Sequence, residues 1–155
     1  MATALNLTAP LKQDAESQQR LKELAAVFAA QVQPKIDAVL AKSEIVHFAR
    51  ILVIDNKYIQ VITEFDGEPD DYAEFFRREL PEVFEAIFTL VEGAPPWDEL
   101  NNRNTFVEFS RKLDVKALGT SPDGDEERGY LFSAFGDTTV REIKKLLNGQ
   151  SAASA

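Results

Sequence analysis

Two apolar runs rich in β-branched residues, separated by a short polar break, make residues 43–67 the most constrained part of the chain. The break is Asp55-Asn56, and both residue types tolerate the positive φ angles of a tight turn. Runs of this kind on either side of a turn predict a β-hairpin. Both faces of the first run, residues 44–54, are apolar except for one polar residue each. This pattern predicts a central strand that is covered on two sides.

The length of the turn decides which side chains lie beside His47, the single histidine of the chain. A two-residue loop places His47 opposite Glu64, and a four-residue loop places it opposite Asp66. A three-residue loop reverses the parity and puts both carboxylates on the face of Arg50. We expect an even loop, because two-residue primed turns are the commonest hairpin connection, and therefore a carboxylate beside His47. His47 and Arg50 can share a pocket only if a β-bulge lies between them.

Composition restricts the kind of protein. With 155 residues, of which 45% are hydrophobic and 10% aromatic, the chain can bury the core of one globular domain. Cysteine is absent from it, which excludes disulfides, thiolate metal sites and thiol catalysis. The net charge is −9, and residues 64–99 hold twelve acids against two arginines. Such an acidic surface argues against nucleic acid or anionic lipid as a partner.

No address signal is visible in the sequence. The longest apolar run falls short of the roughly 18 residues of a membrane-spanning helix, and the start lacks the pattern of a signal peptide. We therefore expect a cytoplasmic protein without a membrane partner.

Along the chain, three segments are predicted. Residues 1–42 form an N-terminal helical extension, in which residues 1–11 are untethered and Pro34 kinks or splits the helical pattern. Residues 43–149 form an α+β domain, and residues 150–155 form a disordered tail. After the hairpin we expect helices starting at Pro69, Pro81, Thr105 and Thr139, a short strand at 115–118 and a strand at 130–135.

This order reads ββαββα, which is a cyclic reordering of the βαββαβ ferredoxin-like unit. Such a layout places the helices on one face of an antiparallel sheet and leaves the other face apolar and open. A monomer rarely exposes a face of that kind. Two sheets packed together in a homodimer would cover it and can leave a cavity between them.

A resemblance to a known family is carried by three short elements: His47-Phe-Ala-Arg50, Phe65-Asp66-Gly67 followed by Tyr72, and Asp137-Thr-Thr-Val140. They resemble an uncharacterised bacterial family of ferredoxin-like, dimeric α/β-barrel type. Related superfamily members include haem-dependent peroxidases and small monooxygenases, as well as many domains without known activity. The resemblance covers residues 43–147 and implies the fold and a dimer. It transfers no catalytic residue.

His47 is the candidate catalytic residue. Paired with Glu64 or Asp66, it can act as an oriented general base, or as the lone axial ligand of a haem iron with a carboxylate behind it. The alternative is a core histidine satisfied by one acceptor. One histidine with carboxylates departs from the usual zinc ligand sets, so we expect no metal site.

The candidate ligand-binding residues are those that can line a cavity. Arg50 can anchor an anionic group, although a structural ion pair is the alternative. Glu64 and Asp66 are included as the possible partners of His47, and the aromatic candidates are Tyr58 and Tyr130.

No motif names a reaction, since the chain has neither a Gly-rich phosphate loop nor a serine in a nucleophile elbow. The residues therefore leave open whether the protein is an enzyme. We expect a dimeric α+β domain that binds a small molecule or cofactor in a cavity, without turnover. The alternative is an oxidoreductase of the haem-dependent peroxidase or cofactor-free monooxygenase kind that uses His47.

Overall fold

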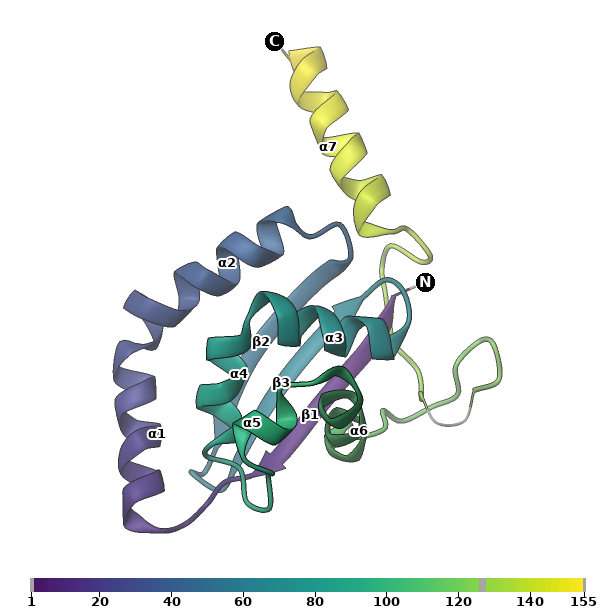
Figure 1. Cartoon of the computed structure of the whole chain (residues 1–155). Coiled ribbons are helices and arrows are strands. Elements are labelled where there is room, and N and C mark those ends of the chain that lie inside the picture. Colours follow the sequence, from purple (N-terminus) through teal and green to yellow (C-terminus); the bar gives the residue numbers. More distant parts are fainter. Residues whose placement is uncertain (1, 126–127, 155) are drawn as a thin grey trace.

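A three-stranded antiparallel sheet with helices packed on one face forms the body of the protein (Figure 1). This computed structural model describes residues 2–125 and 128–154. The strands are β1 (Thr3–Pro10), β2 (Val46–Ile54) and β3 (Tyr58–Phe65), in the order β1-β3-β2. The helices are α1 (Ala15–Val27), the π-helical segment η1 (Phe28–Val32), α2 (Gln33–Lys42), α3 (Pro69–Glu79), α4 (Pro81–Phe88), α5 (Trp97–Leu100), α6 (Arg103–Leu113) and α7 (Val140–Ser154).

The first strand, β1, corrects the prediction that residues 1–11 are untethered. Leu5, Leu7 and Ala9 alternate along β1 and are all buried against the helices. The predicted helical extension 1–42 therefore begins with a strand of the same sheet. Small and polar residues between the leucines weaken the local strand signal, and the pairing partner β3 lies about fifty residues away in sequence. Only the folded sheet reveals this pairing.

The strand β3 lies in the centre of the sheet and β2 lies at its edge, so the prediction that residues 44–54 form a central strand is wrong. On β3, the inward-facing Ile59, Val61, Thr63 and Phe65 are all buried. Most of β2 is exposed or half-buried. Both faces of β2 are apolar, yet the single chain leaves much of their surface exposed.

The hairpin turn has the predicted backbone but a different register. Asp55 and Asn56 both adopt positive φ, at 52° and 53°, and the Lys57 N–H donates to the Ile54 carbonyl at 2.9 Å. The ladder resumes only with Ile54 opposite Tyr58, so three residues separate the paired strands. The predicted even loop is therefore wrong. The odd spacing places the inward face of β3 opposite the odd-numbered residues from Ala49 onward on β2.

Aromatic side chains from α3, α4 and α6 fill the core above the sheet. Tyr72 stacks on Phe65, with ring centroids 3.9 Å apart, and Phe76 packs on Phe84 at 5.0 Å. Phe106 then contacts Phe84 at 5.6 Å. The predicted starts of α3 at Pro69 and α4 at Pro81 are confirmed. This cluster covers the inner face of β3.

Two helix starts differ in how well their capping residues were predicted. Helix α6 is capped by Asn102, whose side chain accepts from the Thr105 N–H at 3.0 Å, so the predicted cap at Thr105 is wrong by three residues. The reciprocal bonds of the second capping box are confirmed: the Thr139 N–H donates to Glu142 at 2.8 Å, and the Glu142 N–H donates to the Thr139 hydroxyl at 3.2 Å.

The segment after α6 contains less strand than predicted. The Val115 N–H donates to the Asn6 carbonyl at 2.9 Å and Asp114 bridges to Leu7, but no ladder follows along 115–118. In the described part of the chain, residues 130–135 pair with no strand. The predicted order ββαββα is therefore wrong at both ends: β1 is an additional strand at the start, and the two strands predicted at 115–118 and 130–135 are absent from the sheet in the described residues. Helix α7 continues to Ser154 through residues predicted to be disordered, and Ala155 lies outside the described residues.

Together, α1, η1 and α2 form one continuous helical stretch, Ala15–Lys42, that is long and apolar enough to cross a membrane by length and composition alone. Its partly buried Leu24, Val32, Ile36 and Val39 pack against the core. The stretch bends around the body in Figure 1. Pro34 and the π-helical segment interrupt its regular backbone bonding. A helix that packs on a protein core can have the same length and composition, so these two properties are only weak support for a membrane span.

Leu7→Ala tests the burial of β1. Removing the buried side chain should cost about 2–5 kcal/mol of unfolding free energy, because a cavity opens beneath the sheet. The matched control is Leu147→Ala on α7, where the side chain is largely exposed and the loss should stay within about 0.5 kcal/mol. Urea denaturation followed by circular dichroism measures both. Equal midpoints for the two variants would contradict the placement of β1.

Candidate functional site

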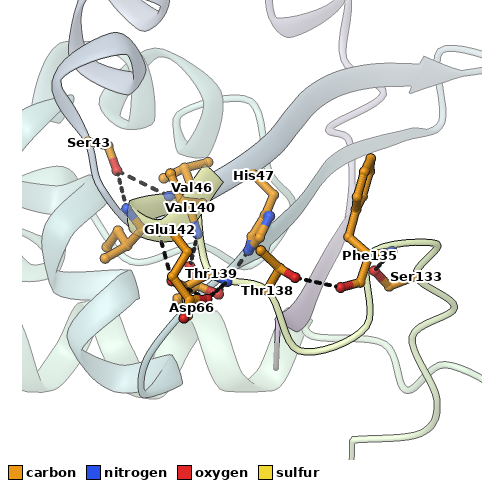
Figure 2. A network of polar contacts seen from close by, with 11 residues as sticks. Ser43, Val46, His47, Asp66, Ser133, Phe135, Thr138, Thr139, Val140 and Glu142 are labelled. Atoms are coloured by element: carbon orange, nitrogen blue, oxygen red, sulfur yellow. Dashed lines mark hydrogen bonds and ion pairs between the residues drawn. The ribbon is translucent and has the colours of Figure 1, made fainter. Parts of the chain in front are cut away.

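His47 and Asp66 form the predicted pair at the end of the hairpin. The His47 Nε2 lies 2.8 Å from Asp66 Oδ1, and the two side chains are only 13% and 15% exposed. Figure 2 shows the imidazole ring pointing at the carboxylate beside the start of α7. The other oxygen, Asp66 Oδ2, accepts from the Val140 N–H at 2.8 Å. Asp66 therefore joins the histidine to the first residue of α7.

A β-bulge creates this contact. Val46 lies opposite Phe65 while Phe48 lies opposite Glu64, so His47 is an extra residue on β2. The bulge aims the His47 ring past the end of β3, where Asp66 follows the strand. The pair was predicted from a loop with an even number of residues. The loop has three residues, and the pair forms because the bulge at His47 compensates for that odd number. The other predicted partner, Glu64, lies opposite Phe48 and away from the histidine.

Further bonds hold the first turns of α7 to the end of α2 and to the segment between α2 and β2. Lys144 Nζ donates to the carbonyls of Ala41 and Ser43, and Arg141 pairs with Glu44 at 2.9 Å. The carboxylate of Asp66 also lies at the positive end of the α7 dipole, which favours an anion. The His47–Asp66 pair is thus part of the attachment of α7, beyond which the helix points away from the body (Figure 1).

A second polar chain is fully buried beside the bulge. The Thr63 hydroxyl donates to the Phe48 carbonyl at 2.9 Å and also contacts the Tyr72 hydroxyl. Because Thr63 has a single hydroxyl proton, Tyr72 must be the donor to Thr63. Burial raises the pKa of Tyr72, so its phenol stays protonated. This chain is internally satisfied and fixes the backbone at the position after His47.

The outer face of the sheet carries three of the predicted ligand-binding residues. Arg50, Glu64 and Tyr58 lie on the face opposite the core, together with Phe48 and other apolar side chains. We call this surface the open face and define it by Phe48, Arg50, Leu52 and Ile54 of β2 and by Tyr58, Gln60, Ile62 and Glu64 of β3. Arg50 and Glu64 are diagonal neighbours on it, yet neither forms an ion pair within the described residues.

Tyr130, the remaining predicted residue, lies apart from the open face and from the His47 pair. Its backbone N–H donates to the Leu118 carbonyl at 3.1 Å, and its ring packs on Phe132 with centroids 4.8 Å apart. Next to it, Gly129 has a φ of 69°, and a Cβ there would come within 2.0 Å of the Ala117 carbonyl oxygen. The backbone segments around Ala117 and Gly129 therefore pack directly against each other at this glycine.

The inner side of the sheet holds a feature that the sequence did not indicate. A cleft of about 150 Å³ lies between α2 and β2, with core side chains of α3 and α4 among its lining residues. We call it the α2–β2 cleft. Its residues come from six separate helices and strands, so no local sequence signal joins them. Within the described residues, no three acidic or histidine side chains gather as metal ligands.

Comparisons with protein-family models, with curated proteins and with solved structures found no match for this chain. The roles predicted for His47, Arg50, Glu64, Asp66, Tyr58 and Tyr130 therefore depend on geometry alone. That geometry brings together two sets, the His47–Asp66 pair and the trio on the open face.

A double-mutant cycle on His47 and Asp66 tests the attachment of α7. Asp66→Ala should cost about 1–3 kcal/mol, because it leaves a helix N–H and the imidazole without their acceptor. His47→Ala should cost less, and the two losses should couple by at least about 0.5 kcal/mol. Amide exchange of α7 should accelerate in both variants.

The control for this cycle is Asp137→Ala, because this exposed carboxylate precedes the same helix and is absent from the contacts that hold α7. Additive losses for His47 and Asp66, together with unchanged exchange in α7, would show that the pair does not hold the helix.

Proposed function

We propose that the protein is a homodimeric α+β domain that binds a small molecule without chemical turnover, and that two copies pack through their open faces. One observation carries the proposal. On the open face Phe48 is 70% exposed, Leu52 37%, Ile54 44% and Tyr58 46%. Adjacent apolar side chains of this size are rarely left to water in a monomer.

The chain order supports a ferredoxin-like fold in its ordinary order. A strand, a helical connection, a hairpin and further helices succeed one another, and Asp114-Val115 then returns beside β1. This is the βαββαβ order with its last strand reduced to a bridge. Such sheets carry their helices on one face, which leaves the open face for a partner.

Charge on the open face favours a second copy as that partner. Arg50 and Glu64 lie on the same face without pairing within their own chain. In a twofold interface every contact occurs twice, so Arg50 of each copy can meet Glu64 of the other. Two reciprocal pairs would neutralise both charges and fix the relative position of the sheets. The partner is therefore chemically complementary to the surface that it covers.

The oxidoreductase alternative gains no support from the His47 geometry. A general base or an axial ligand needs its second ring nitrogen open to the reacting group, while the first can bond a carboxylate. Nε2 of His47 is bonded to Asp66, but the two side chains are only 13% and 15% exposed, and Asp66 is bonded in turn to the start of α7. We therefore assign the pair a structural role and propose binding without catalysis.

Phe48→Glu tests the dimer by placing a charge in the proposed interface. The wild type should have twice the chain mass in light scattering at micromolar concentration, and Phe48→Glu should have the mass of one chain, because burying an unpaired carboxylate is costly. The matched control is Phe132→Glu. Phe132 is also an exposed phenylalanine, but it lies outside the open face. This control variant should stay dimeric.

A charge exchange tests the reciprocal pairs. Arg50→Glu should weaken the dimer at least about tenfold, since like charges then face each other, and Arg50→Glu with Glu64→Arg should recover most of the affinity. Sedimentation measures the dissociation constants. A monomeric wild type, or a double variant weaker than the single one, would contradict this interface.

A further inference from the structure

We infer that each protomer carries its own binding site for a single-ring aromatic molecule with a polar substituent, and that this site is the α2–β2 cleft. The inference deepens the proposed function by naming the place and the class of ligand, and it depends on that function only for small-molecule binding. The dimer is not required, because the cleft lies on the helix side of the sheet and the open face lies on the other side.

The lining of the cleft selects an apolar ligand. Val61 of β3, Phe76 of α3, Phe84 of α4 and Leu80 between these two helices contribute to it from the buried core. Ile36 of α2 and Ile51 of β2 contribute from the edge and are half-buried. Transfer of an apolar ligand from water to such a surface is favourable in proportion to the area buried.

Size and shape favour one ring. The cleft measures about 150 Å³, and an engineered protein cavity of about that volume, lined by similar side chains, binds benzene. The rings of Phe76 and Phe84 lie 5.0 Å apart and are tilted by 37°. Aromatic pairs in tilted or offset geometry are favourable beyond the area they bury, so a planar ring fits this lining better than a saturated one.

Polar side chains mark where a substituent would lie. Gln33 and Asp37 of α2 are also lining residues, and both are exposed. Asp37 makes no ion pair within the described residues. A hydroxyl group can donate to the Asp37 carboxylate and accept from the Gln33 amide, whereas a ligand carboxylate would be repelled by Asp37. A phenol is therefore the expected class.

Titration with phenol, followed by ¹⁵N amide shifts, tests the inference on the full chain. We expect saturable shifts at Ile36, Ile51 and Val83, with a dissociation constant of about a millimolar, which is reasonable for a ligand of so few atoms. Cyclohexanol should bind at least about threefold more weakly, and benzoate should not saturate.

Ile36→Trp provides the site-specific variant, because the residue lies on a half-buried surface where a larger ring can fill the cleft without displacing the core. It should weaken phenol binding at least about tenfold. The matched control is Val39→Trp on the same helix, which is also half-buried but does not line the cleft, and it should bind normally.

The Phe48→Glu variant separates this inference from the proposed function. Phenol binding that survives in this variant supports the cleft. Binding that is lost with the dimer but unaffected by Ile36→Trp would place the ligand between the sheets, which would overturn the inference and leave the proposed function standing. If the wild type shows no saturable binding of phenol, while Ile36→Trp is folded and dimeric, the inference is overturned as well.

Discussion

The central position of β3 is the constraint on which the rest of the structure depends. It is hydrogen-bonded to β1 on one side and to β2 on the other, and its inner face supplies Ile59, Val61, Thr63 and Phe65 to the core. Tyr72 of α3 stacks on Phe65 and donates its hydroxyl to Thr63. The register of β3 therefore decides which residues of both neighbouring strands face the helices and which face outward.

The bulge at His47 shows how a correct contact can be predicted from a wrong register. The sequence identifies the turn residues Asp55 and Asn56, whose positive φ angles are confirmed, and it brings a carboxylate near the histidine. Sequence spacing cannot distinguish a bulge from an even loop, because both restore the same parity beyond the irregular residue. Only the pairing of Phe48 with Glu64 shows which of the two applies.

The parts that the sequence predicts well are those with strong local chemistry. Pro69 and Pro81 start helices, and Thr139 with Glu142 forms a capping box, as expected from the residues alone. The parts that it misses depend on distant partners. Strand β1 needs β3 to hold Leu5 and Leu7 in the core, and the α2–β2 cleft is assembled from six elements. Phe132 and its neighbours read as a strand, but no partner lies beside them in the described residues.

The edge strand β2 connects these results to function. Apolar residues on both of its sides predict cover on two faces, and the helices cover only one of them, in part, since Val53 on that side is still 43% exposed. The central claim is that a second copy covers the other. Intermolecular NOEs measured on a sample of mixed labelled and unlabelled protein test this claim most directly. Contacts from Phe48, Leu52 and Ile54 to the other copy are the predicted result, while contacts confined to Leu146 and Leu147 of α7, or none at all, would contradict it.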